Sequence, residues 1–345
     1  MVSEWRETTL GDVIELKRGY DLPQKERKPG NVPLVSSSGV SDKHSVAMVK
    51  GPGVVTGRYG TIGKVFFVEE DFWPLNTTLY VRDFKGNDPR FISYFLRGIN
   101  FHAYTDKAAV PGVNRNDLHL AEVVFPNDVG EQRAIAETLG ALDDHIDNLR
   151  QTNATLEAIA AALFKSWFVD FDGVAPEDMQ ESELGLIPKD WRVVAFGDIA
   201  TQGKGSVNPM NAPEQVFTHY SLPAFDASQI PVQELGDTIK SNKTPVPDDS
   251  VLVSKLNPHI PRIWLVGEAG YNAVCSTEFI VWTPKQPANS AFMYCLASSR
   301  EFNHSMRQFV TGTSNSHQRV KPEQIADIRV IAANDEAIAK FSEGS

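Results

Sequence analysis

Apolar residues recur with a regular spacing along one long stretch in the middle of the chain. From Ile135 to Trp167 the intervals alternate between four and three residues, which is the pattern of a coiled-coil seam on one face of an α-helix. The pattern predicts a helix from Glu131 to Phe168, about 57 Å long at ~1.5 Å per residue. The seam consists of Ile135, Leu139, Leu142, Ile146, Leu149, Asn153, Leu156, Ala160, Leu163 and Trp167.

Two features of this helix concern its packing. Asn153 interrupts the apolar seam, where a buried asparagine can fix the register and the number of helices; a solvent-exposed asparagine is the alternative. The helix ends in an aromatic face, which is typical of packed core but would also suit the docking of another protein. That face consists of Phe164, Trp167, Phe168 and Phe171.

The segments on either side of the helix resemble each other. Matching stretches occur in the same order, and the offset between partners stays between 186 and 205 residues, far longer than the period of a solenoid repeat. We therefore predict a duplicated domain. The matches pair residues 5–14 with 191–200, 75–81 with 274–280, 91–96 with 291–296, 120–125 with 325–330, and 134–136 with 337–339.

Short β-like runs and helical stretches are mixed within each copy. Residues 54–68 are predicted as strand, glycine turn and strand, and residues 250–266 are their counterpart. Residues 90–101 and 291–302 are predicted as short amphipathic helices. The expected fold class is therefore mixed α/β, with two copies of one domain joined by a long helix of the coiled-coil type.

The same patterns predict the boundaries of the parts. An acidic segment interrupted by glycine and proline links the helix to the second copy, and Asn334 is suited to cap a further helix. That last helix begins with Ile338 and Phe341 and is expected to be too short to bury anything. The predicted parts are a first domain at 1–128, the long helix at 129–172, a linker at 173–190, a second domain at 191–333, and the start of a second helix at 334–345.

Charge is distributed unevenly along the chain. The net charge of the 345 residues is −11, yet residues 1–128 hold 16 basic and 16 acidic residues, whereas residues 129–190 hold 4 basic and 13 acidic ones. Each predicted domain can therefore present a basic face to a nucleic acid. No stretch approaches the ~20 apolar residues of a membrane span. Cys275 and Cys295 are too few for a disulfide framework or a zinc cluster, and we expect a soluble, cytoplasmic protein with buried thiols.

Motifs for catalysis are not found in the sequence. Residues 57–65 resemble a phosphate-binding loop, but Arg58 and Val65 stand where that motif needs glycine and a hydroxyl. Asp12 and the E-L-K run at 15–17 lack the second carboxylate of a nuclease site. The eight histidines form no zinc-binding pair, and the motifs of amino-methyltransferases and of serine hydrolases are missing. A stand-alone nuclease or methyltransferase is therefore not favoured.

Candidate DNA-binding residues gather in segments that match between the two copies. The glycine hairpin combines cations with an aromatic ring, which suits pairing with phosphates and stacking on bases. The basic K-R-G-Y loop at 17–20 and the loop at 105–116 extend this set, and residues 311–321 correspond to the latter. For any single candidate, the alternative to DNA binding is that the side chain is ordinary solvent-exposed surface. The candidates are Lys17, Arg18, Tyr20, Arg58, Tyr59, Thr61, Lys64, Lys107, Asn114, Arg115, Lys255, Asn257, His259, Arg262, Asn315, His317 and Arg319.

These stretches resemble a known family. Residues 131–172, which end in L-F-K-S-W-F-V-D-F-D, and the E-L-G-L-I-P-K-D-W run at 183–191 closely resemble the central conserved region of type I restriction-modification specificity subunits. The W-x5-G-D starts of both copies and the G-R-x-G-T-I-G-K hairpin are similar to the target recognition domains of that family. The resemblance covers essentially the whole chain.

The resemblance implies a non-catalytic subunit whose two target recognition domains each read one half of a split double-stranded DNA target. It also implies that two antiparallel conserved helices separate the domains and that methyltransferase subunits dock on them. Restriction subunits driven by ATP complete the enzyme. S-adenosylmethionine, ATP and magnesium are then expected on the partner subunits, and no cofactor or metal is expected on this chain.

The chain departs from the family pattern at the second conserved helix. Residues 334–345 match only its start, so we expect a chain truncated there, by nature or by engineering, and a first helix without a full partner of its own. The seam and the aromatic face could then pair with a second copy or with helices of the methyltransferase subunits. The alternative function is a coiled-coil adaptor, or a crippled truncation, that binds partner subunits without reading DNA sequence.

Overall fold

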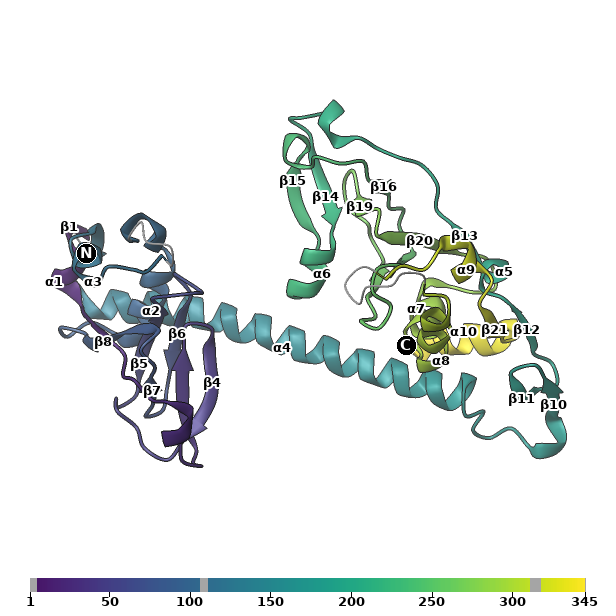
Figure 1. Cartoon of the computed structure of the whole chain (residues 1–345), viewed down its shortest axis with the longest axis horizontal. Coiled ribbons are helices and arrows are strands. Elements are labelled where there is room, and N and C mark those ends of the chain that lie inside the picture. Colours follow the sequence, from purple (N-terminus) through teal and green to yellow (C-terminus); the bar gives the residue numbers. More distant parts are fainter. Residues whose placement is uncertain (1–4, 106–110, 311–317, 345) are drawn as a thin grey trace. The chain divides into compact units, whose positions relative to one another are not determined.

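A computed structural model describes residues 5–105, 111–310 and 318–344, and Figure 1 shows its helices and strands. The chain forms two compact units, Met1–Arg150 and Gln151–Ser345, and the boundary between them falls inside one long helix. This helix, α4, is Val129–Phe168. The predicted helix is therefore confirmed, with a start two residues earlier than expected.

Unit 1 contains small sheets with a simple strand order. The four-stranded sheet has the order β2-β8-β5-β6, a second sheet has the order β4-β3-β7, and β1 pairs with β9. The strands are β1 (Trp5–Thr9), β2 (Glu15–Arg18), β3 (Val32–Ser36), β4 (Gly39–His44), β5 (Gly53–Gly57), β6 (Val65–Val68), β7 (Trp73–Pro74), β8 (Thr78–Asp83) and β9 (Glu122–Pro126). The helices are α1 (Leu10–Val13), η1 (Gln24–Glu26), α2 (Pro89–Arg97), η2 (Phe101–Tyr104) and α3 (Arg115–His119).

Unit 2 follows the same plan after a short hairpin of β10 and β11. Its strands are β10 (Met179–Ser182), β11 (Gly185–Pro188), β12 (Arg192–Ala195), β13 (Ala200–Gln202), β14 (Val216–Tyr220), β15 (Val232–Leu235), β16 (Thr244–Pro245), β17 (Ser250–Ser254), β18 (Ile263–Val266), β19 (Val274–Cys275), β20 (Phe279–Pro284) and β21 (Arg329–Ala332). Its helices are η3 (Pro176–Asp178), α5 (Phe196–Ile199), η4 (Pro209–Asn211), α6 (Leu222–Ser228), η5 (Gly236–Thr238), α7 (Ser290–Ser298), α8 (Arg300–Gln308), α9 (Pro322–Ala326) and α10 (Asp335–Gly344).

The strand order shows that the domain is duplicated. The order β13-β20-β17-β18 in unit 2 repeats β2-β8-β5-β6 in unit 1, and β12 pairs with β21 as β1 pairs with β9. The parallel pairing of β14 with β19 likewise repeats that of β3 with β7. The duplication and the mixed α/β class predicted from the sequence are therefore confirmed.

The central hairpin of each unit follows from its apolar pattern. β5 and β17 each have a strand on both sides, and all their residues are buried, which is why their sequences are apolar runs without alternation. Each turns back into an antiparallel neighbour, with Val54 opposite Phe67 and Leu252 opposite Trp264. The hairpins predicted at 54–68 and 250–266 are confirmed.

The short helices differ from their predicted bounds. Residues 291–302 were predicted as one helix, but α7 ends at Ser298 and α8 begins at Arg300. Ser299 has an extended backbone between them, and its Oγ accepts a hydrogen bond from the Phe302 N–H at 3.2 Å. This cap starts a new helix and interrupts the earlier one. In unit 1, α2 ends at Arg97 before the predicted end at residue 101.

The first half of α4 is anchored in unit 1 by polar contacts. Gln132 is fully buried, and its amide donates to the Pro126 carbonyl at 2.9 Å and accepts from the Asp88 N–H at 3.0 Å. Further along the helix, Asp143 accepts hydrogen bonds from Tyr94 at 3.1 Å and from Arg97 at 2.9 Å. These contacts hold α4 against α2.

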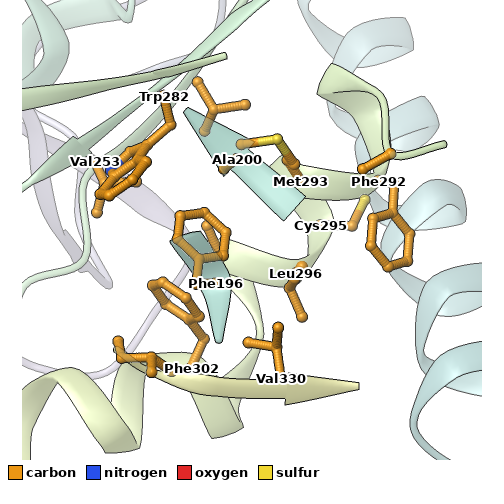
Figure 2. Packing of buried hydrophobic residues seen from close by; sticks show 14 of the residues in the cluster. Phe196, Ala200, Val253, Trp282, Phe292, Met293, Cys295, Leu296, Phe302 and Val330 are labelled. Atoms are coloured by element: carbon orange, nitrogen blue, oxygen red, sulfur yellow. The ribbon is translucent and has the colours of Figure 1, made fainter. Parts of the chain in front are cut away.

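The last turns of α4 form part of the core of unit 2. Phe164 and Phe168 are buried, and their rings lie 5.6 and 5.0 Å from that of Phe292, which Figure 2 shows beside the helix. Deeper in the same core, Phe196 packs edge-on against Trp282 at 5.0 Å. The prediction that the aromatic face of the helix is packed core is thus supported for Phe164 and Phe168.

The final helix, α10, is buried more deeply than its length suggested. Asn334 caps it, because the Asn334 side chain accepts a hydrogen bond from the Ala337 N–H at 2.9 Å. Ile338 and Phe341 are 3% and 1% exposed and belong to the core of unit 2. The expectation that this helix buries nothing was wrong, since α4 and α7 supply a ready apolar surface for one short helix.

The middle of α4 is the exposed part of the seam. Leu142, Leu149 and Leu156 are 56%, 50% and 58% exposed, and Asn153 is exposed as well. In the described part of the chain no helix covers these positions. The solvent-exposed alternative for Asn153 therefore holds within the single chain.

Candidate nucleic-acid interface

Two of the predicted DNA-binding segments meet in unit 1. The hairpin between β5 and β6 is joined to the segment before α3 by a bridge between Tyr59 and Gly112, and the Val113 N–H donates to the Arg58 carbonyl at 3.0 Å. A side chain at Gly112 would place its Cβ 2.2 Å from the Tyr59 ring, so only glycine allows this close approach. The ring of Tyr59 thus packs on backbone within the site.

A polar pocket of about 470 Å³ lies between these segments and the end of β2. Arg18 comes from β2 and Arg58 from the hairpin, while Asn114 caps α3 by accepting a hydrogen bond from the Asn116 N–H at 3.0 Å. We call it the arginine pocket. Its polar lining consists of Arg18, Arg58, Asn114, Arg115 and Asn116.

The arginine pocket carries more positive charge than its surroundings neutralise. Arg18 pairs with Asp21 at 3.5 Å, with both side chains more than half exposed. The Arg58 guanidinium lies 4.6 Å from the centre of the Tyr59 ring, and in the described residues neither Arg58 nor Arg115 has a carboxylate partner. Three guanidinium groups around one hollow form a site for an anion such as a phosphate.

Other candidates in unit 1 lie outside this pocket. Lys17 and Arg18 are consecutive residues of β2 and not part of a loop as predicted, so their side chains point to opposite faces. The Lys17 ammonium lies 5.4 Å over the Tyr20 ring, and the Tyr20 hydroxyl is 2.9 Å from that of Tyr80. Lys64 is exposed and Thr61 half-buried on the hairpin.

The sequence did not single out Asn116. The structure places it in the arginine pocket because the Asn114 cap starts α3 there. The one available signal was Asn114 itself as a helix cap two residues earlier. Lys107, Asn315 and His317 lie outside the described residues and stay predictions.

Unit 2 repeats the hydrogen-bonded framework of this site. The Lys255 N–H donates to the Glu278 carbonyl at 2.9 Å, and the Val320 N–H donates to the Lys255 carbonyl at 3.0 Å. In unit 1, Arg58 makes the same two contacts, with Thr77 at 2.9 Å and with Val113 at 3.0 Å. Lys255 therefore occupies the place of Arg58.

The two predicted segments of unit 2 are also joined. The Asn257 N–H donates to the Gln318 carbonyl at 2.8 Å, and the Asn257 side-chain oxygen accepts from the Gln318 N–H at 3.2 Å. Asn257 has a left-handed backbone with φ of 51°, which asparagine tolerates better than most residues. These contacts give Asn257 a structural role in holding the segments together.

The arginines of unit 2 are neutralised more fully than those of unit 1. Arg262 donates to both carboxylate oxygens of Asp226 at 2.6 and 2.9 Å, and Arg319 donates to both of Glu278 at 3.1 and 2.9 Å. The hydrogen bond from Arg262 lowers the pKa of Asp226. DNA contacts by Arg262, Arg319 and the exposed His259 stay predictions.

Lowering the pH is expected to destabilise unit 1 through His119. The His119 Nε2 accepts a hydrogen bond from the Leu16 N–H at 2.9 Å, and burial, followed by the charge of Arg115, lowers the pKa of the imidazole. The unfolded chain therefore binds the proton more readily. Stability that is present above the unfolded pKa of about 6.5 is lost as the pH falls through the lower folded pKa. Urea denaturation between about pH 7.5 and pH 5.5 measures this loss.

The control for this prediction is His119→Gln. Its amide oxygen can accept the same hydrogen bond but does not titrate, so the variant is expected to lose less stability over that pH range. Equal losses in the variant and the parent chain would contradict the role of His119.

Other kinds of site find no support in the described residues. There, no group of three or more His, Cys, Asp or Glu side chains could hold a metal ion. Both cysteines are buried, and burial raises the pKa of the Cys275 thiol to about 12 and that of Cys295 to about 11. Among the helices described, none combines the length and the apolar character that crossing a membrane requires.

Parts of the chain are similar in sequence to known proteins. The family model described as the type I restriction modification DNA specificity domain matches residues 2–158. The chain is 55% identical over 200 residues to the type I restriction enzyme HindI specificity subunit of Haemophilus influenzae, a match that covers 50% of this chain and 42% of that protein. It is 38% identical over 132 residues to the MjaIX specificity subunit of Methanocaldococcus jannaschii, covering 38% and 28%. These matches span less than half the length of either relative.

A solved structure shows the same fold. The crystal structure of the type I restriction-modification system S subunit from M. genitalium aligns with a TM-score of 0.59 at 15% identity, over 99% of this chain and 90% of that one. The likeness to this structure concerns the fold, and the sequence similarity is to specificity subunits of type I restriction enzymes.

Proposed function

We propose that this chain recognises double-stranded DNA and that each unit reads one half of a bipartite target. The repeated framework, which places Arg58 and Lys255 at equivalent positions, is the observation that carries the proposal. Two copies of one recognition module on a single chain suit two separated half-sites. The guanidinium groups of the arginine pocket supply phosphate contacts, and such contacts position a protein on a duplex.

We further propose that α4 docks methyltransferase subunits. Its middle presents the exposed leucines of the seam, and an apolar surface of this kind marks an interaction site. The methyltransferase subunits would bring S-adenosylmethionine, and restriction subunits would add the chemistry that depends on ATP and magnesium. The chain itself then contributes recognition and assembly.

Removing the two unneutralised arginines of unit 1 is expected to weaken binding to every duplex alike. The Arg58→Ala, Arg115→Ala double variant loses two phosphate-pairing cations, so the slope of log affinity against log salt should fall by about two. Fluorescence anisotropy of a labelled duplex from low to high salt measures both quantities for the full chain.

The matched control is Arg6→Ala, which removes an exposed arginine of β1 outside the arginine pocket. It should leave affinity and salt slope within about the error of the parent chain, since surface substitutions away from a site have small effects. Salt-independent binding, or equal losses in both variants, would count against the DNA interface proposed for unit 1.

One observation favours a second function. The exposed leucines of α4 exist whether or not the units bind DNA, so an adaptor that joins partner subunits without reading sequence would show the same surface. DNA binding by the purified full chain separates the two: an adaptor would hold methyltransferase subunits but show no salt-dependent affinity for a duplex.

A further inference from the structure

A second pocket, lined by both polar and apolar side chains, lies beside the arginine pocket in unit 1. It has a volume of about 530 Å³ and is formed by the segment after β2, the turn between β3 and β4, and the segment between β7 and β8. We call it the serine pocket. Its lining includes Asp21, Ser36, Ser37, Ser38, Asn76 and Thr77.

The two pockets adjoin through direct contacts. Arg18 of the arginine pocket pairs with Asp21 of the serine pocket at 3.5 Å. The Arg58 and Tyr59 N–H groups both donate to the Thr77 carbonyl, at 2.9 and 3.2 Å. A duplex held by its phosphates at the arginine pocket therefore lies next to the serine pocket.

The chemistry of the serine pocket differs from that of a phosphate site. Arg27, which also lines it, pairs with Asp42 at 2.9 Å, and Asp21 brings a negative charge that would repel phosphate. The remaining polar side chains are hydroxyls and an amide, which both donate and accept hydrogen bonds. The edges of base pairs in the major groove also present donors and acceptors side by side.

Two shielded atoms of this pocket have no partner within the described part of the chain. They are the Oγ1 of Thr77 and the Nε of Arg27. Shielded polar atoms in folded proteins almost always have a hydrogen-bond partner, because an unmade bond costs free energy. Both residues line the pocket, so the chain itself does not satisfy all the polar groups around it.

Asn76 is the side chain best placed to read a base. It is half-buried, and its Nδ2 donates to the Asp21 carboxylate, which fixes the orientation of the amide. Its second N–H and its Oδ1 make no hydrogen bond with the described residues. These two groups are complementary to the major-groove edge of adenine: the N–H can donate to N7, and the Oδ1 can accept from the N6 amino group.

We propose that Asn76 reads an adenine in the half-site of unit 1, with Asp21 as its positioning residue. This inference rests on the proposed DNA recognition and names the base that one part of the interface selects. The arginine pocket then supplies affinity for any sequence, and the serine pocket supplies the choice of base.

The test starts with selection from a pool of randomised duplexes by the purified full chain. The enriched motif of the parent chain should contain an A·T pair at which Asn76→Ala loses its preference, while binding to the unselected pool stays within about twofold. Asn31→Ala, an exposed asparagine outside both pockets, is the matched control and should keep the motif.

A second measurement uses modified DNA and the unaltered chain. Replacing the selected adenine by 7-deazaadenine removes the N7 acceptor and should weaken binding by the parent chain at least about fivefold. The affinity of Asn76→Ala for the duplex should change less than twofold on the same replacement. Asp21→Asn keeps the pocket filled but loosens the amide, so its response should be intermediate.

The outcomes distinguish this inference from the function on which it rests. If the parent chain enriches no motif, the proposed recognition fails. If it enriches a motif that Asn76→Ala leaves unchanged, or if 7-deazaadenine is tolerated at every adenine of the motif, recognition stands and the assignment of Asn76 is overturned. The measurement with 7-deazaadenine tests the assignment of Asn76 even if Asn76→Ala folds poorly, because it uses the parent chain.

Discussion

Phe341→Ala is expected to lower the free energy of unfolding of unit 2 by about 3–5 kcal/mol, the range for truncating a buried phenylalanine. Phe341 is 1% exposed, and its ring lies 6.0 Å from that of Phe164 and 5.4 Å from that of Phe168. Removing the ring leaves a cavity between α10 and the end of α4. Urea denaturation followed by tryptophan fluorescence measures the change, since Trp167 lies 6.3 Å from the same ring.

The matched control for this prediction lies on α4 itself. Leu156 is 58% exposed, so Leu156→Ala should change the free energy of unfolding by less than about 0.5 kcal/mol. A small effect of Phe341→Ala, similar to that of the control, would show that α10 contributes little to the core of unit 2.

Leu149→Glu is expected to abolish most of the binding of a methyltransferase subunit while leaving the chain folded. Leu149 is 50% exposed in the middle of the seam, and glutamate forms helix nearly as well as leucine. A carboxylate buried in an apolar interface without a partner should cost about 2 kcal/mol or more, roughly a 30-fold loss of affinity. Titration of the full chain with the methyltransferase subunit measures it.

Gln151→Glu is the control, because it adds the same charge to an exposed position on the opposite face of the same helix. It should bind the partner as the parent chain does. Equal losses would indicate a general effect of charge and not a contact with the seam. If Leu149→Glu instead prevents self-association of the parent chain, the seam pairs with a second copy.

The sequence predicted several members of the arginine pocket but not their grouping. Arg18, Arg58, Asn114 and Arg115 come from three segments, and residue types alone identified them as candidates. Lys17 and Tyr20 were predicted alongside them, yet Lys17 points away from the pocket because consecutive residues of a strand alternate between faces. Sequence reasoning treated residues 17–20 as a loop and so missed that alternation.

The serine pocket shows where prediction from sequence ends. Asp21 and Asn76 are 55 positions apart, and each is an ordinary polar residue of a turn when viewed locally. Their contact depends on the parallel bridge between Tyr20 and Leu75, the residues just before them, which no short-range pattern specifies. The carboxylate partners of Arg262 and Arg319 in unit 2 could not be predicted either, because they also lie far away in the sequence.

The sequence by itself determined the long helix, the duplication and the central hairpins, because spacing and repetition are properties of the chain in one dimension. Only the tertiary structure decided which cations converge, which are neutralised, and that α10 is buried. These outcomes depend on strands and helices distant in sequence coming together, and a side chain such as Phe341 is buried only when its partner surface is present.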